Sequence, residues 1–212
     1  MHHANLDYKW HPQPSSLRLA TQAAKLARID GSKVLDCFCG TGTLLVAAIR
    51  AGAEKAIGSD IEDWSQYLRP QLKEMMKYSL LGSRIELHWR VDAFEAVERF
   101  DHDILFTDPP GPWEIIGGVL ISVKRDLGIN GNELRKFWEK RLSDGNWINK
   151  KHRTVANVIK LFRTEIERGK RVVANLFAQN PWRGTNRSLA RVLAPVFDLR
   201  HLVGNWYEVR LK

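Results

Sequence analysis

Four acidic residues are the side chains of this chain best placed to do chemistry: Asp36, Asp60, Asp92 and the acid of Asp108-Pro109-Pro110. Each stands at or just past the end of a short apolar run that is typical of a buried strand. A Gly-x-Gly turn follows the first acid, through Cys37, Phe38, Cys39, Gly40, Thr41, Gly42 and Thr43. Such a turn between a strand and a helix lets a ligand approach the backbone, because glycine has no Cβ and tolerates positive φ. The ordered series predicts a ligand site built from successive strand ends.

Strands alternating with helices must position these acids. Apolar patterning predicts strands over 33–39, 55–60, 84–90, 103–107 and 170–177, and a closing hairpin over 196–203 and 206–211. Helices are expected over 17–26, 41–51, 93–99, 155–168 and 188–193. Another helix is expected to run from a cap at Asp63 to Leu80, with Pro70 in its first turns.

This alternation predicts an α/β fold: a doubly wound, Rossmann-like, seven-stranded and mostly parallel sheet with a C-terminal antiparallel hairpin. A helical insert is expected after the fourth strand. A single domain is expected over residues 1–212, with an N-terminal arm and helix over 1–30 and a basic helical insert over 113–153. Ligands bind such sheets at the carboxyl ends of the strands, where all four acids are expected.

The insert interleaves cations with aromatic rings. Its aromatic residues include Trp138 and Trp147, and its cations are Lys124, Arg125, Arg135, Lys136, Lys140, Arg141, Lys150, Lys151 and Arg153. Cations that hold phosphates and rings that stack on exposed bases suit unpaired RNA. The alternative is an ordinary helical subdomain in which Phe137, Trp138 and Leu142 pack inward. Asn180-Pro181-Trp182-Arg183 is a second candidate for substrate contact.

The charge balance also favours an anionic partner. The net charge is +9 and the pI near 9.7, and contacts to phosphates dominate non-specific affinity for nucleic acids. A solubilising surface is the alternative. No apolar run approaches the roughly 20 residues that cross a bilayer, and no signal-peptide core is present, so a cytoplasmic protein is expected. The two cysteines and the histidines lack metal-site spacing, so no metal is expected.

The motifs resemble those of class I S-adenosylmethionine-dependent methyltransferases. The closest similarity is to the catalytic domain of THUMP-associated RNA guanosine N2-methyltransferases. It rests on the loop 36–43, the upstream segment 14–20 and Asp108-Pro109-Pro110. The resemblance implies S-adenosyl-L-methionine as cofactor, RNA as the preferred nucleic-acid partner, and an exocyclic base amine, guanine N2 first, as acceptor.

The resemblance also implies the cofactor-binding residues. Gly40 and Gly42 would let backbone amides meet the methionine part, and Asp36 would receive its amino group. Asp60 would bind the ribose hydroxyls, while Ile61 packs on the adenine and Asp92 accepts from the adenine amino group. The full expected set is Asp36, Cys37, Phe38, Cys39, Gly40, Thr41, Gly42, Thr43, Asp60, Ile61, Asp92, Ala93 and Asp108. Helix capping is the alternative role for Asp60 and Asp92.

The expected catalytic residues are Asp108, Pro109, Pro110 and Trp113. An acidic side chain and a proline carbonyl can hold both hydrogens of a base amine and aim its nitrogen at the methyl group. The family usually has an aromatic residue after the second proline, but this chain has Gly111-Pro112-Trp113. Trp113 is therefore the candidate for stacking on the base.

Three other functions fit the same residues. One is a DNA methyltransferase acting on adenine N6 or cytosine N4 of a flipped base. Another is a small-molecule or protein methyltransferase, which would leave the basic insert unexplained. A non-enzymatic alternative is a degenerate methyltransferase fold that serves as an RNA-binding partner. Whether an accessory RNA-binding subunit delivers the substrate stays open.

Overall fold

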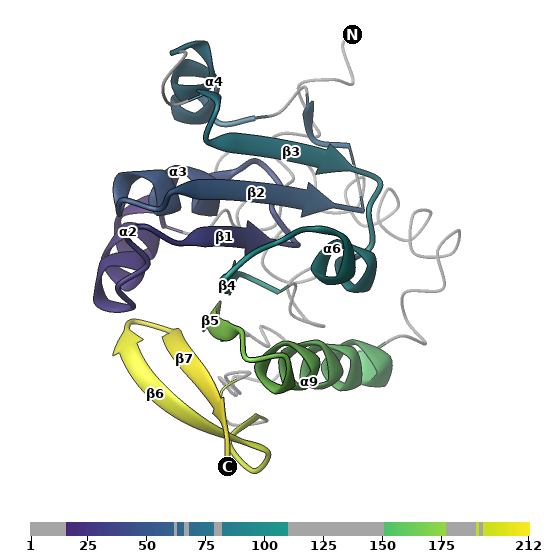
Figure 1. The fold of residues 1–212 in the computed structure, drawn as a ribbon. Helices are drawn as coiled ribbons and strands as arrows, with labels where there is room; N and C mark the ends of the chain where they lie inside the picture. The colour runs from purple at the N-terminus through teal and green to yellow at the C-terminus, as the bar shows by residue number, and fades with distance from the viewer. Residues whose placement is uncertain are drawn as a thin grey trace, which may run out of the picture.

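A seven-stranded sheet forms the centre of the protein (Figure 1). The computed structural model describes residues 16–61, 63–65, 68–78, 82–109, 151–176, 190 and 193–212. The strands lie in the order β3-β2-β1-β4-β5-β7-β6. The first five are parallel to their neighbours, and the last two are antiparallel. The predicted doubly wound sheet with a C-terminal hairpin is confirmed.

The parallel strands converge on a switch point between β1 and β4. Their bounds are β1 Lys33–Asp36, β2 Lys55–Asp60, β3 Ile85–Trp89, β4 Ile104–Thr107 and β5 Arg171–Asn175. Leu35 of β1 is in register with Ile57 of β2 on one side and Leu105 of β4 on the other. The strand order reverses its direction at this pair, and open α/β sheets bind ligands beyond the carboxyl ends of such strands.

The hairpin closes the sheet at the edge opposite β3 (Figure 1). It consists of β6 Phe197–Val203 and β7 Trp206–Leu211, and β7 pairs with β5. Gly204 has a φ of +57°, a conformation that the missing Cβ makes accessible. The alternating apolar pattern and the Gly204-Asn205 turn thus form the hairpin that they predict.

Helices cover both faces of the sheet. Helices α2 Leu17–Leu26, α3 Thr43–Arg50 and α4 Pro70–Lys77 contribute to one core cluster, whereas α6 Ala93–Arg99 and α9 Lys151–Glu167 contribute to the other. The buried residues of α9 include Val158, Leu161 and Phe162. This i, i+3, i+4 spacing gives the helix one apolar face, which packs on the sheet.

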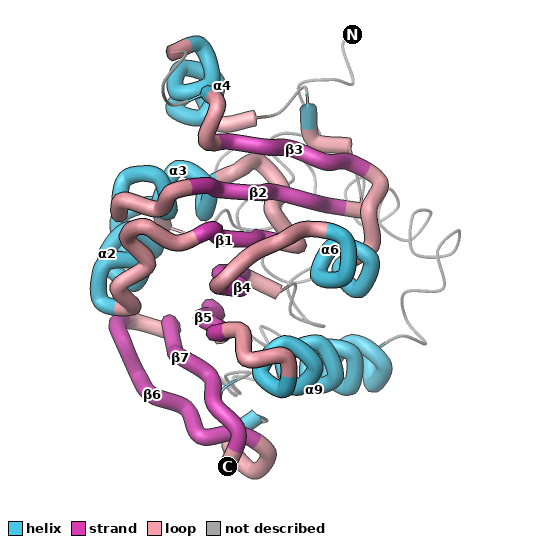
Figure 2. The backbone as a smooth tube through the Cα atoms, in the orientation of Figure 1, coloured by secondary structure: helices cyan, strands magenta, loops and turns pink. Residues whose placement is uncertain are grey.

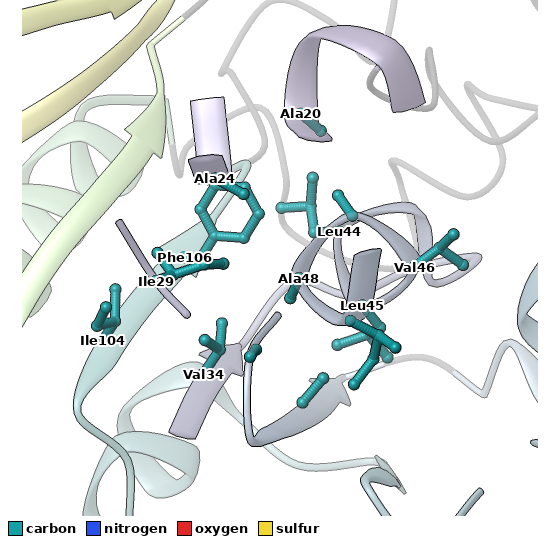
Figure 3. Packing of buried hydrophobic residues seen from close by; sticks show 14 of the residues in the cluster. Ala20, Ala24, Ile29, Val34, Leu44, Leu45, Val46, Ala48, Ile104 and Phe106 are labelled. Carbon is teal, nitrogen blue, oxygen red and sulfur yellow. The ribbon is translucent and has the colours of Figure 1, made fainter. Parts of the chain in front are cut away.

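The α2 side of the core is packed closely because α2 presents alanines to it. Ala20 and Ala24 are fully buried and lie close to Leu44 and Phe106 (Figure 3). Phe106 of β4 also stacks on Trp206 of β7, with ring centroids 4.8 Å apart. Such an aromatic pair contributes about 0.5–1.5 kcal/mol beyond its buried area. It joins the hairpin to the parallel part of the sheet.

The first strand and the helix before β3 have different bounds from those that the sequence predicts. The first strand ends at Asp36 rather than at Cys39, because the chain turns into the glycine loop directly after the acid. Helix α4 begins at Pro70, where a missing N–H costs nothing. The prediction of a cap at Asp63 is therefore wrong: its side chain accepts a hydrogen bond from the Ser65 backbone N–H at 3.0 Å.

The basic insert lies largely outside the described residues. Helix α9 begins at Lys151 instead of the predicted Val155, so residues 151–153 of the predicted insert belong to this helix. The rest of the insert, the arm before residue 16 and the segment 180–183 stay predictions. No helix in the described ranges is long and apolar enough to cross a membrane.

Candidate active site

Four acids lie at the carboxyl ends of four adjacent parallel strands, as predicted. Asp36 and Asp60 are the last residues of β1 and β2, and Asp108 directly follows β4. Asp92 follows β3 after two intervening residues. Because these strands are neighbours and parallel, the loops that follow them leave from one edge of the sheet (Figure 2). Asp36 and Asp60 both contact the loop after β1, where they accept from the Phe38 and Gly40 N–H groups. The hydroxyl of Thr107, the residue before Asp108, donates to Asp36.

The loop 37–43 is shaped by two glycines with positive φ. Gly40 has a φ of +46° and Gly42 one of +84°. Gly42 is also the N-cap of α3, and a Cβ there would lie 2.2 Å from Cδ2 of the fully buried Leu72. Backbone conformation and space both restrict position 42 to glycine. The glycine loop therefore depends on α4, which the motif alone does not reveal.

The amides of this loop already have partners within the protein. The Phe38 N–H donates to Asp36 Oδ1 at 3.2 Å, and the Gly42 N–H to the Cys39 carbonyl at 2.8 Å. The Gly40 N–H donates to Asp60 Oδ2 at 2.9 Å. The two glycine amides thus hold the loop in shape, and their predicted contact with a ligand would require these bonds to open.

The two cysteines lie in the loop, with both thiols buried and free. Cys37 packs in the α6–α9 cluster and Cys39 in the α2–α3 cluster. Burial raises the pKa of both thiols well above the ordinary value, so neither is a nucleophile at neutral pH. Their role is to fill space on the two sides of the loop.

Asp36 is a buried carboxyl group with only part of its hydrogen-bonding capacity used. It is 1% exposed, and its Oδ1 accepts from the Thr107 hydroxyl at 3.0 Å as well as from Phe38. Its Oδ2 is buried and has no hydrogen-bond partner in the part of the chain that the structure describes. Burial raises the pKa of Asp36 well above its ordinary value, and the charges of Asp108 and Asp60 raise it further. A cationic group placed beside Oδ2 would favour the ionised form.

Asp36 should make the stability of the protein depend on pH. Since its pKa is higher in the folded chain, the folded state binds more protons above the ordinary value of 3.8. The free energy of unfolding should therefore fall as pH rises from about 4 to the folded-state pKa, by at most about 1.4 kcal/mol per pH unit. Denaturant titrations at a series of pH values should show this slope reduced in Asp36→Asn.

Asp101→Asn is the matched control for that series. Asp101 is exposed and forms an ion pair with Lys33 at 2.7 Å, at the opposite end of β4. Its hydrogen bond with Lys33 lowers its pKa, so the contribution of this acid has the opposite sign. An equal slope in the original chain and in Asp36→Asn would show that Asp36 is not the group responsible.

Asp60 and Asp92 differ in what they do locally. Asp60 binds the glycine loop, because its Oδ2 accepts from the Gly40 N–H. Asp92 is the N-cap of α6, and its Oδ1 accepts from the Phe94 N–H at 2.8 Å, so the alternative role as a cap applies to this acid. Beside them, Ile61 is 61% exposed, whereas Ala93 is buried. An exposed apolar side chain next to a strand-end acid suits contact with a flat ring.

Asn175 is a residue that the sequence analysis missed. It ends β5, and its Nδ2 donates to Asp108 Oδ2 at 3.2 Å. Its Oδ1 is buried and has no hydrogen-bond partner among the described residues. The signal in the sequence was a polar residue at the end of the fifth apolar run, the same signal that marks the four acids. Pro109 is buried beside Asp108, while Pro110 and Trp113 lie outside the described residues.

Arg69 is a second residue that the sequence analysis did not single out. It is the N-cap of α4, its backbone N–H donates to the Thr41 carbonyl at 2.9 Å, and its Nε donates to Thr43 Oγ1 at 2.6 Å. It brings a positive charge to the glycine loop at the start of α3. No group of three or more metal-ligating side chains occurs within the described ranges.

A family model described as "Conserved hypothetical protein 95" matches residues 9–126, which include all four strand-end acids. The chain belongs to this family. A segment of 108 residues is 38% identical to the "tRNA (guanine(10)-N2)-dimethyltransferase" of Methanocaldococcus jannaschii. The match covers 48% of this chain and 30% of that relative, so the chain spans less than a third of its length.

A solved structure has a fold similar to that of this chain. The pyocyanin biosynthetic protein PhzM has a TM-score of 0.50 and 16% identity, over 90% of this chain and 53% of that one. A methyltransferase from Geobacter sulfurreducens has a TM-score of 0.48 and 19% identity, over 95% of this chain and 81% of that one. The strand order and the likeness to PhzM confirm the fold that the resemblance to class I methyltransferases predicts.

Proposed function

We propose that this protein transfers a methyl group from S-adenosylmethionine to an exocyclic amine of a base in RNA, with guanine N2 as the first candidate. The observation that carries the proposal is that Asp36 and Asp60 hold the glycine loop at the switch point, where Thr107, the neighbour of Asp108, donates to Asp36. The tRNA guanine specificity in the name of the archaeal relative supports the choice of acceptor.

The residues present fit the methyl donor. Asp36 offers a buried carboxylate oxygen, Oδ2, that has no hydrogen-bond partner in the described ranges and suits an ammonium or sulfonium group. Arg69 contacts the end of the loop through Thr43, and its guanidinium suits a carboxylate. Asp60 can accept from ribose hydroxyls, and the exposed Ile61 can pack on the adenine. Asp92 would accept from the adenine amino group.

The reaction needs an amine that is correctly placed, since the donor supplies an electrophilic methyl group on sulfur. Asp108 would accept a hydrogen bond from the base amine, and the Pro109 carbonyl would accept a second one. Asn175 fixes one oxygen of Asp108, and its own Oδ1 is buried with no hydrogen-bond partner among the described residues. Held in this way, the nitrogen lone pair can point at the methyl carbon. Orientation of two reactants can supply about 7–11 kcal/mol of the barrier.

Calorimetry tests the cofactor half of the proposal. The protein is expected to bind S-adenosylmethionine or its demethylated product, and Asp60→Ala should weaken this binding because the variant loses both the ribose acceptor and the partner of the Gly40 N–H. Asp101→Ala, at the opposite end of β4, should bind as the original chain does. If neither ligand binds at millimolar concentration, the proposal is wrong.

The acceptor is tested with labelled cofactor against total RNA and total DNA. Transfer to RNA, followed by nucleoside mass spectrometry that shows N2-methylguanosine, is the expected result. Transfer to DNA alone would contradict RNA as the acceptor and favour the DNA methyltransferase alternative. Binding of nucleic acid without any transfer would indicate the non-enzymatic alternative.

A further inference from the structure

A cavity lined by arginines lies on the α2 face of the sheet, away from the strand-end acids. It has a volume of about 430 Å³ and is lined by Leu26, Ala27, Arg28, Arg171, Arg200, Glu208 and Arg210. The side chains of β7 alternate, so that Trp206 packs in the α2 cluster while Tyr207 and Val209 pack in the α9 cluster. Glu208 and Arg210 therefore lie on the same face of the strand as Trp206, the face on which α2 packs.

One buried carboxylate holds three of these arginines. Glu208 is 6% exposed, and its oxygens lie 3.1 Å from Arg171 Nη2, 2.6 Å from Arg200 Nη2 and 2.9 Å from Arg210 Nη2. Burial opposes ionisation of Glu208, but hydrogen bonds from Arg210 and Arg171 outweigh it and hold its pKa below the ordinary value. Glu208 is therefore ionised, and it orients the guanidinium groups.

The carboxylate cannot neutralise the cluster. Four arginines and one glutamate line the cavity, which leaves an excess of three positive charges. The side chains of Arg171, Arg200 and Arg210 remain 40%, 49% and 54% exposed. A guanidinium has five donors, and the bonds to Glu208 use only some of them. Arg171 also donates to the Ala27 and Arg28 carbonyls, so Arg200 and Arg210 keep the most capacity for a ligand.

We propose that this arginine cavity binds phosphate groups of the RNA backbone, several nucleotides away from the base that is methylated. The inference rests on the proposed function for its choice of RNA. Strand β5 links the two sites, because Arg171 begins it and Asn175, which bonds to Asp108, ends it. Four residues of strand rise about 13 Å, a distance that a short stretch of RNA spans. Guanidinium groups in a fixed cluster suit phosphate oxygens in charge and geometry.

The test compares two double variants that remove equal charge. Arg200→Gln/Arg210→Gln alters the cavity, whereas Arg99→Gln/Arg163→Gln alters exposed arginines on α6 and α9. Fluorescence anisotropy with a single-stranded RNA oligonucleotide should show roughly tenfold weaker binding for the cavity variant. Its salt dependence, the slope of log K against log salt, should become shallower by about 1.4, the value for two lost phosphate contacts to a single strand. The control variant should change affinity less than twofold.

Conservative replacement separates charge from structure. Arg200→Lys/Arg210→Lys keeps both charges and should keep affinity within about threefold, because a lysine still contacts phosphate as a point charge. An equal loss in the Lys and Gln variants would overturn the proposal, since the effect would then come from the disrupted Glu208 cluster. Equal weakening by the cavity and control variants, or no change in either, would overturn it as well.

Two further ligands distinguish RNA from other anions. ATP and a polyglutamate peptide are expected to bind the cavity at least tenfold more weakly than the oligonucleotide. If the affinity for ATP or polyglutamate depends on Arg200 and Arg210 while the affinity for RNA does not, the assignment to RNA is wrong. Calorimetry with S-adenosylmethionine on the same variants should show unchanged binding. If even the original chain fails to bind this cofactor, the proposed function fails, while the RNA comparison still decides the role of the cavity.

Discussion

The Asp108→Ala variant should lose on the order of 10²-fold of the methyl-transfer rate, because a nucleophile that is displaced by about 1 Å loses about this much. The same variant should bind S-adenosylmethionine within about threefold of the original affinity, because Asp60 and the loop hold the donor in the proposal. The loss should therefore appear in the chemical step, and single-turnover transfer with labelled cofactor measures it. Full activity in Asp108→Ala would remove this acid from the mechanism.

Two companion variants sharpen this prediction. Asp108→Asn keeps one oxygen, which can accept from the Asn175 Nδ2 or from the base amine, so it should be more active than Asp108→Ala but less active than the original chain. Asp101→Ala removes an exposed acid at the opposite end of β4 and should leave the rate unchanged. If Asp108→Asn is as inactive as Asp108→Ala, the charge of Asp108 matters rather than its ability to accept a hydrogen bond.

Replacing Glu165 by alanine should lower the free energy of unfolding by about 1–3 kcal/mol, the usual cost of leaving a buried polar group without its partner. Glu165 is fully buried in α9, and its Oε2 lies 2.6 Å from Nε2 of the buried His102. The other ring nitrogen, Nδ1, donates to the Phe100 carbonyl at 2.8 Å. His102 thus faces acceptors on both sides, and without Glu165 one of its nitrogens stays buried and unpaired. Denaturant unfolding measures the loss.

Glu167→Ala is the matched control on the same helix. Glu167 is exposed, so its replacement should change the free energy of unfolding by less than about 0.5 kcal/mol. The double variant His102→Ala/Glu165→Ala should cost less than the sum of the two single changes, because the pair acts as a unit. Strict additivity in this cycle would contradict a direct interaction and leave the packing of α9 to account for the loss.

The sequence was sufficient for the order of elements and for the edge of the sheet that carries the site. Apolar runs and helical spacing predicted all seven strands, because burial imposes a periodic pattern on each segment. Element ends were less well predicted. Pro70 shows the reason. A proline is tolerated at several positions of the first turn of a helix, so the sequence does not say where α4 starts. In the structure, Arg69 contacts Thr41 and Thr43 and α4 begins at the next residue.

Interactions across long stretches of the chain were beyond the reach of the sequence. Asn175 meets Asp108, and His102 meets Glu165, over separations of 67 and 63 residues. A local pattern carries no information about such pairs when a single polar residue stands in an apolar run. The arginine cavity is hidden for the same reason, since its lining comes from α2, β5, β6 and β7.

The sequence by itself determined the strand-end acids, the glycine turn and the class of fold, since these depend on local spacing and on the burial of one face. The tertiary structure alone decided the burial of Asp36 and the hydrogen-bond partners of these acids. Asp36 is buried beside two other carboxyl groups, Asp60 holds the glycine loop and Asp92 caps a helix. The pKa and the free hydrogen-bonding capacity of a side chain depend on its neighbours in space, which only the folded sheet brings together.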